Sequence, residues 1–182
     1  MEARIYYVVI LIDSPNIFIG QKEYLEWKID VKKLTEHLIG ENDELFEAYY
    51  YMPRFKKENS AREKFKSVIQ NLKLPNGKTF TIRERKKSIK NLFKADAMQI
   101  INGGLIDKIV LVSGDSEFLS VVQAGKAAKI KITVASIQES LSHELEKEAD
   151  EVIILNDLRK EIELANGHEE QLQLFPSEKL RE

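Results

Sequence analysis

Short apolar runs alternate with amphipathic stretches along most of this 182-residue chain. Continuous runs rich in Val, Ile and aromatic residues are typical of strands buried on both faces of a sheet, whereas apolar residues spaced three and four apart are typical of helices. We predict strands at residues 5–12, 45–52, 79–85, 109–112, 131–135 and 152–155. We predict helices at residues 29–39, 59–72, 95–101, 116–128, 141–148 and 157–165. This alternation predicts an α/β fold, with a Rossmann-like, mostly parallel sheet and helices on both of its faces.

Hydrophobic periodicity fades after residue 165. Residues 1–165 are long enough to bury one core, so we predict a single domain there. Residues 166–182 are mainly polar, with an apolar cluster formed by Leu172, Leu174 and Phe175. We therefore expect a flexible, acidic C-terminal tail.

Composition narrows the class of protein. The chain is 43% hydrophobic and 32% charged, which is typical of a globular protein, and its apolar runs are too short to span a membrane. The absence of cysteine excludes disulfides, thiolate zinc sites and cysteine nucleophiles. Because the first residues lack a basic start and a small-residue cleavage site, we expect no secretory signal and a cytoplasmic protein.

Positive charge is concentrated in the middle of the chain. The net charge is −2, yet residues 52–94 hold fourteen Lys and Arg against three Glu, a local net charge of +11. Such a field attracts polyanions, so we expect RNA as a partner. The alternative is that these residues are only the solvated faces of a helix and a strand. The predicted RNA contacts are Arg83, Arg85, Lys86, Lys87, Lys90 and Lys94.

Acidic residues follow two of the predicted strands. Asp13 comes after the first, and Asp115 and Glu117 come after the strand at residues 109–112. Ligands of open α/β sheets bind at the carboxyl ends of the strands. Asp96, expected at the start of a helix, would lie at the same edge. Crowded carboxylates are tolerated beside a divalent cation such as Mg²⁺ or Mn²⁺, which favours phosphodiester hydrolysis.

Each acid has a structural alternative. Asp13 could cap a turn before Pro15, and Asp115 or Ser116 could cap the following helix. A metal-dependent phosphatase or a Toprim-like protein is a further alternative, because Asp115 and Glu117 form a suitable acid pair. It ranks last, since no Asp-x-Asp nucleophile follows the first strand.

Four motifs in this order resemble the NYN domain, in particular its bacterial LabA-like branch. They are Asp13-Ser-Pro-Asn16, Lys94-Ala-Asp96, Ser113-Gly-Asp115-Ser116-Glu117-Phe118 and Ala149-Asp150, and the resemblance covers about residues 4–160. The NYN domain is similar to PIN domains, Rossmann-like folds whose acidic pocket binds Mg²⁺ or Mn²⁺ and, in active members, cleaves RNA. The resemblance implies that Asp13, Asp96 and Asp115 bind metal and that Glu117 is a fourth catalytic carboxylate. It also implies substrate contacts from Asn16, Ser113 and Ser116.

These observations predict a metal-dependent endoribonuclease that acts on single-stranded RNA. The alternative is a catalytically weak RNA-binding or regulatory NYN module. Asn102 favours this alternative, because many relatives carry a second acid six residues after the position of Asp96. Glu117 also stands where the family usually has Asp. The RNA target, the pathway and the oligomeric state, including a homodimer, stay open.

Overall fold

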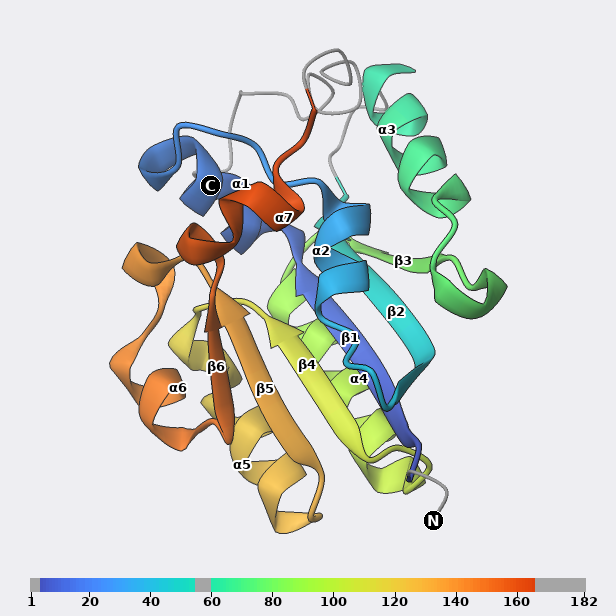
Figure 1. The fold of residues 1–182 in the computed structure, drawn as a ribbon, viewed down its shortest axis with the longest axis vertical. Coiled ribbons are helices and arrows are strands. Elements are labelled where there is room, and N and C mark those ends of the chain that lie inside the picture. The colour runs from blue at the N-terminus through green and yellow to red at the C-terminus, as the bar shows by residue number, and fades with distance from the viewer. Residues whose placement is uncertain (1–3, 55–59, 166–182) are drawn as a thin grey trace.

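One parallel sheet forms the centre of the protein, seen in a computed structural model that describes residues 4–54 and 60–165 (Figure 1). Within these residues six strands follow the order β3-β2-β1-β4-β5-β6, and all neighbours run parallel. The predicted Rossmann-like α/β fold is confirmed. The strands are β1 (Tyr6–Asp13), β2 (Asp43–Pro53), β3 (Phe80–Arg85), β4 (Lys108–Val112), β5 (Lys131–Ser136) and β6 (Glu151–Ile154).

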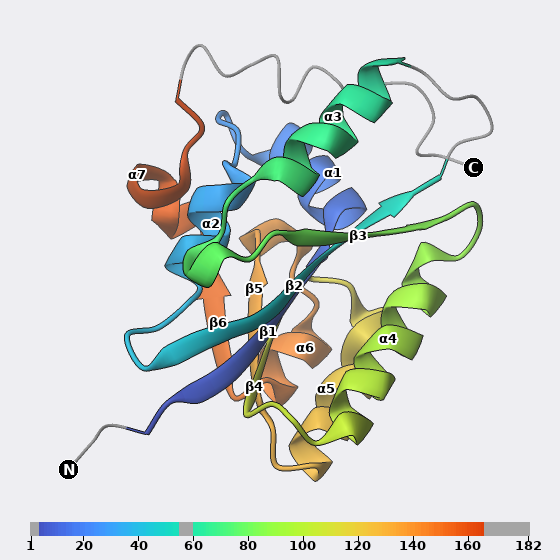
Figure 2. The same cartoon turned by 90° about the vertical axis from the view of Figure 1, so that its right-hand side faces the viewer.

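Helices cover both faces of this sheet. In Figure 2, α4, α5 and α6 lie on one side, and α2, α3 and α7 lie on the other. Short 3-10 turns, labelled η, complete several connections. The helices are α1 (Ser14–Tyr24), α2 (Val31–His37), α3 (Ser60–Asn71), α4 (Ile89–Gly103), α5 (Leu119–Ala127), α6 (His143–Glu148) and α7 (Arg159–Ile162). The turns are η1 (Pro75–Gly77), η2 (Ser116–Phe118), η3 (Gln138–Ser140) and η4 (Leu155–Leu158).

Strand β1 is buried on both faces, as its continuous apolar run predicts. Val8 and Ile10 belong to the core beneath α2 and α3, whereas Val9 and Leu11 belong to the core beneath α4 and α5. All four side chains are at most 1% exposed. The strand is therefore a rigid support for whatever follows its last residue.

The direction of the strand order reverses between β1 and β4. β2 and β3 extend the sheet on one side of β1, while β4, β5 and β6 extend it on the other. Ile12 pairs with Val112 across this boundary. The segments after these two residues therefore meet at the switch point, where ligands of doubly wound sheets bind.

Helix α1 was not predicted from the sequence. Pro15 suggested a turn, but proline fits the first turn of a helix because no hydrogen-bond donor is required of its nitrogen there. The helix begins directly after β1, with Pro15 in its first turn. The helix then runs to Tyr24.

The predicted start of α4 was wrong by six residues. The helix begins at Ile89, not near residue 95, and Lys90 and Lys94 belong to it. The buried residues Phe93, Ala97 and Ile101 recur every four positions and hold the helix against the sheet. Asp96 consequently lies in the middle of α4, not at its first turn.

Two other predictions concern the end of the chain. The last helix is shorter than expected, because α7 ends at Ile162. The predicted tail at residues 166–182 lies outside the described residues. In the part of the chain that the structure describes, no helix combines the length and the apolar composition needed to cross a membrane.

Candidate functional site

The loops after β1 and β4 are joined by a short chain of hydrogen bonds. The Ser113 hydroxyl donates to Oδ2 of Asp13 over 2.8 Å and accepts from the backbone N–H of Asp115 over 3.2 Å. The backbone N–H of Gly114 donates to Oδ1 of Asn16 over 3.1 Å. The structure therefore brings together Asp13, Asn16, Ser113 and Asp115 at the switch point of the sheet.

Asp13 is the buried acid of this cluster. It directly precedes α1, as the capping alternative expects, but its carboxylate reaches across the switch point to Ser113. Only 3% of the residue is exposed. Burial raises the pKa of Asp13 to about 6; the Ser113 hydrogen bond opposes this rise and the Asp115 charge adds to it.

Asp115 serves both as a turn cap and as part of an ion-pair cluster. Its Oδ1 accepts from the backbone N–H of Glu117 over 2.9 Å, so the capping alternative is correct for one oxygen. Its Oδ2 contacts the Lys90 ammonium, which also lies 2.9 Å from Oε1 of Glu117. Burial would raise the pKa of Asp115, but Lys90, the Glu117 N–H and the charge of Lys94 together hold it below its ordinary value.

Asp96 has bonding partners other than those of this cluster. Arg83 donates two hydrogen bonds to the Asp96 carboxylate, from Nε to Oδ2 at 2.7 Å and from Nη2 to Oδ1 at 2.8 Å. The Tyr51 hydroxyl donates to Oδ2 over 3.1 Å. In the sheet Tyr51 pairs with Asp13 on one side and with Arg83 on the other, so both partners of Asp96 lie in register with Asp13, on β2 and β3. The structure thus places Asp96 in a bidentate ion pair with a residue that we had assigned to RNA.

The predicted RNA contacts divide into two groups. Arg83, Lys90 and Lys94 are paired with acids, Lys94 through a distance of 3.7 Å between its Nζ and Oε2 of Glu117. Arg85, Lys86 and Lys87 are exposed in and after the end of β3, and no ion pair joins them to another described residue. Arg85, Lys86 and Lys87 can therefore bind a phosphate backbone without first breaking an ion pair with a described residue.

This division predicts opposite effects of two substitutions. Arg83→Gln should lower the free energy of unfolding by about 1–3 kcal/mol, because Asp96 would lose its charged donor inside the protein. Lys86→Ala should leave stability within about 0.5 kcal/mol but weaken RNA binding and reduce the salt slope by about one. Urea unfolding and RNA binding at several salt concentrations measure both. Weaker RNA binding by folded Arg83→Gln than by Lys86→Ala would contradict the division.

The oxygen ligands at the switch point suit a sparsely held divalent cation. Among residues 4–54 and 60–165, no three Asp, Glu or His side chains are grouped closely enough to hold a metal ion. Mg²⁺ needs only one or two protein carboxylates when water and phosphate oxygens complete its shell. Asp13 and Asp115 fit that requirement, with the Lys90 ammonium now beside Asp115. Asp96 adds nothing to this set in its present contacts.

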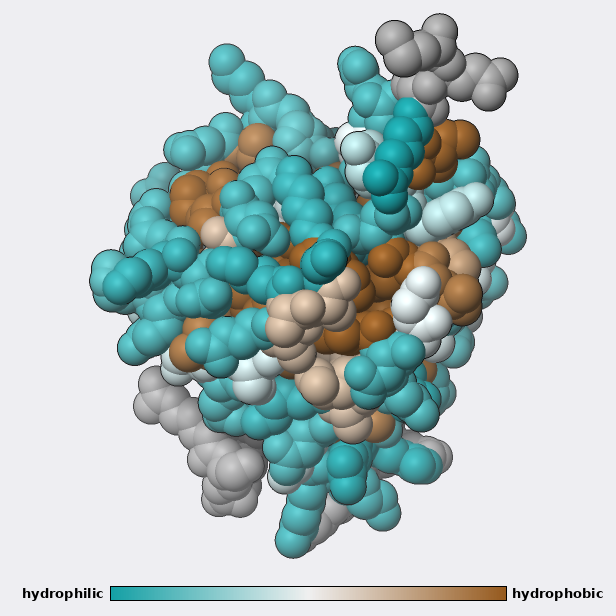
Figure 3. Space-filling view, turned by 90° about the horizontal axis from the view of Figure 1, so that it is seen from below, coloured by the Kyte–Doolittle hydropathy of each residue, from teal (hydrophilic) through white to brown (hydrophobic). Residues whose placement is uncertain are grey.

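The other end of the sheet offers a different surface. Figure 3 views the molecule from that end, where apolar side chains gather inside a hydrophilic surround. Leu105 and Ile5 are 67% and 56% exposed there.

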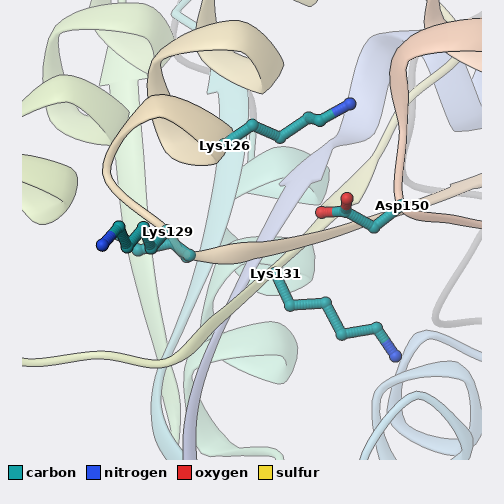
Figure 4. A pocket seen from close by; sticks show the side chains of 5 residues that line it. Lys126, Lys129, Lys131 and Asp150 are labelled. Atoms are coloured by element: carbon teal, nitrogen blue, oxygen red, sulfur yellow. The ribbon is translucent and has the colours of Figure 1, made fainter.

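A hollow of about 420 Å³ at the same end of the sheet is lined by Lys126, Lys129, Ile130, Lys131 and Asp150. Its lysine side chains point in different directions, and Lys126 and Lys131 pair with Glu148 and Glu151, so they form no convergent site (Figure 4).

Sequence reasoning missed two participants in the site, Tyr51 and Gly114, and assigned a third, Lys90, to RNA instead of to the acids. Tyr51 bonds to Asp96, Lys90 bridges Asp115 and Glu117, and Gly114 permits a close backbone approach. Only Gly114 carried a usable signal, because a glycine at the end of a buried strand often marks a tight packing position. The partners of Tyr51 and Lys90 depend on where α4 lies in space.

Comparisons with known proteins agree with this architecture. A solved structure of a Vibrio parahaemolyticus protein of unknown function has 19% sequence identity and a TM-score of 0.67; the match covers 90% of this chain and all of that one. It shows the fold alone. No curated protein matches the chain. The NYN domain model matches residues 7–156, from β1 through all the acids discussed above, and the NYN fold is a PIN-like nuclease fold. The chain belongs to the NYN domain family.

Proposed function

We propose that this protein binds single-stranded RNA and hydrolyses its phosphodiester bonds at the switch point, with Mg²⁺ or Mn²⁺ as cofactor. One observation carries the proposal: where β1 and β4 end, the Ser113 hydroxyl donates to the Asp13 carboxylate and accepts from the backbone N–H of Asp115, and the two acids lie close enough for the Asp115 charge to raise the pKa of Asp13. Two carboxylates so placed repel each other unless a cation lies nearby. Membership of a family with a PIN-like nuclease fold supports the same chemistry.

The basic residues of this region form a path to the acids. Arg85, Lys86 and Lys87 lead into α4, whose first turns carry Lys90 and Lys94 beside Glu117. A phosphate backbone attracted by the exposed group would therefore reach the pocket along α4. This arrangement favours a polyanionic substrate over a small neutral one.

Individual side chains then have distinct parts in the proposed reaction. Asp13 and Asp115 would hold the metal, which when bound polarises the phosphate and lowers the pKa of a water. Glu117 has a half-exposed side chain and would orient that water. Asn16 accepts from Gly114 with its oxygen, which leaves its amide nitrogen to donate to a phosphate oxygen. Ser113 keeps Asp13 oriented, and Ser116 would contact the substrate from the first position of η2.

Cleavage of a fluorescent single-stranded RNA in the presence of Mn²⁺ tests this proposal. Asp115→Asn should reduce the rate by about 100-fold or more, because one charge of the metal pocket is lost. Asp150→Asn is the matched control: Asp150 is exposed at the other end of the sheet and accepts from the N–H of Ile132, which an amide oxygen can still do. Equal cleavage by wild type and Asp115→Asn, or cleavage unaffected by EDTA, would contradict the proposal.

The second candidate function is RNA binding without cleavage. The ion pairs of Lys90 and Arg83 favour it, because they neutralise Asp115 and Asp96 without any metal. Asn102 does not support this second function, because it is exposed in the last turn of α4, about three turns after Lys90. It lies just before the end of the helix, where Gly104 adopts the left-handed conformation. RNA binding that persists in EDTA, with no cleavage at any Mn²⁺ concentration, would favour this function.

A further inference from the structure

Lys90 places its ammonium against Asp115, one of the two acids proposed to hold the metal. Its ammonium contacts Oδ2 of Asp115 and lies 2.9 Å from Oε1 of Glu117. Lys94, one turn later, reaches only Glu117, at 3.7 Å. The two lysines therefore balance Glu117 of η2 and Asp115 just before it, and of the two lysines only Lys90 touches a proposed metal ligand.

The core fixes Lys90 in this position. Phe93 lies between the two lysines on α4, is 1% exposed, and packs against Phe118 of η2 with ring centroids 4.3 Å apart. This contact clamps the start of α4 beside the turn that carries Asp115. The lysine side chain itself is 40% exposed, so it can leave its partners without disturbing the core.

Two cations cannot share Asp115 without strong repulsion. A divalent ion bound by Asp13 and Asp115 would lie within a few ångströms of the Lys90 ammonium, where charges of the same sign repel. Metal binding thus requires Lys90 to swing out. An RNA phosphate next to the pocket offers the ammonium another anionic partner, so RNA would make the metal site easier to fill.

We propose that Lys90 is an internal counter-ion which couples metal binding to RNA binding. Without RNA it neutralises Asp115 and Glu117 and keeps metal affinity low. When a phosphate backbone enters along α4, Lys90 exchanges its carboxylate partners for a phosphate, and the divalent ion takes its place. This coupling rests on the proposed function, because it assumes that RNA and metal meet at this pocket.

Titration of Mn²⁺, followed by the paramagnetic resonance signal of the free ion, tests the proposal without any turnover. Lys90→Met should bind Mn²⁺ about tenfold more tightly than wild type or better, because a repelling charge is removed. Lys90→Arg keeps the charge and should bind like wild type. Lys94→Met should have a smaller effect than Lys90→Met. Unchanged or weaker Mn²⁺ binding by Lys90→Met would overturn the proposal.

The coupling is measured by repeating the titration with a phosphorothioate oligouridylate, which resists hydrolysis. The oligonucleotide should tighten Mn²⁺ binding to wild type and leave Lys90→Met nearly unaffected. Equal tightening in both proteins would overturn the role of Lys90. RNA cleavage is assayed separately. If Lys90→Met binds Mn²⁺ more tightly but neither protein cleaves RNA, the proposed hydrolysis is refuted and the counter-ion role of Lys90 is supported. If RNA is cleaved but Lys90→Met has the Mn²⁺ affinity of wild type, hydrolysis is supported and the counter-ion role is refuted.

Discussion

Replacing Gly114 with alanine should lower the free energy of unfolding by about 2–4 kcal/mol, because the protein has no room for one more methyl group at this position. A Cβ atom there would lie 2.0 Å from the backbone oxygen of Ser140 and 2.5 Å from the Ser136 hydroxyl. The Gly114 carbonyl also accepts from the N–H of Ser142 over 2.9 Å, so the two segments cannot separate without losing that bond. Urea denaturation measures the effect.

Gly103 provides the matched control. It lies at the end of α4, and an added Cβ would meet no atom within 4 Å. Gly103→Ala should therefore leave stability unchanged or raise it by up to about 1 kcal/mol, as expected when alanine replaces glycine in a helix. Wild-type stability of Gly114→Ala would show that the segment at Ser140 does not press against the site.

Gly114→Ala should also impair the site, since Gly114 lies between Ser113 and Asp115. A shift of this backbone would move the hydroxyl that bonds to Asp13 and the N–H that bonds to Asn16. RNA cleavage should then fall even at temperatures where the variant remains folded. In this protein the packing of η3 against the β4 loop and the geometry of the acids depend on the same residue.

The sheet could be predicted from the sequence because its cause is local. The apolar run that became β1 is buried on both sides, and an uninterrupted Val and Ile segment has few other stable arrangements. Parallel strands then place Asp13 and Asp115 at one edge whatever the loops do. Alternation of elements was therefore enough to find the switch point.

The partners of the acids could not be predicted in the same way. Asp96 was expected in the first turn of α4 because the helix was thought to begin near residue 95, whereas it begins at Ile89 and Asp96 lies in its middle. Its bond with Arg83 and that of Asp115 with Lys90 depend on the position of α4, which the Phe93 and Phe118 contact fixes. Ion pairs between different helices and strands depend on such tertiary contacts, and they produce no periodic pattern in the sequence from which they could be predicted.

Asp13→Asn should make the protein more stable at pH 8 and, if the proposed function holds, should abolish RNA cleavage. The pKa of Asp13 is raised from 3.8 to about 6, mainly by burial, so the folded protein disfavours the ionised carboxylate. Between pH 4 and pH 6 folding is therefore accompanied by the uptake of a proton at Asp13. The stability that neutral Asp13 contributes is complete below pH 4 and is lost as the pH rises through 6. Above pH 6 the free-energy cost of burying the ionised carboxylate is constant at about 3 kcal/mol.

An amide at this position has no charge to desolvate, and its oxygen can still accept from the Ser113 hydroxyl. Asp13→Asn should therefore exceed wild-type stability by about 2–3 kcal/mol at pH 8, and the two proteins should converge near pH 4. Urea unfolding in EDTA measures this, because a bound divalent ion would itself stabilise the carboxylate of the wild type.

Asp115→Asn provides a control of opposite sign. The pKa of Asp115 is held below its ordinary value, so its ionised form stabilises the fold, and that contribution is lost as the pH falls through the lowered value. Asp115→Asn should thus be less stable than wild type at pH 8. If both substitutions lower the stability at pH 8, the ionised Asp13 carboxylate does not destabilise the folded protein. If only Asp115→Asn lowers it, the ionised Asp13 carboxylate does destabilise the folded protein. A destabilising carboxylate is expected at a position where the residue is needed for its chemistry.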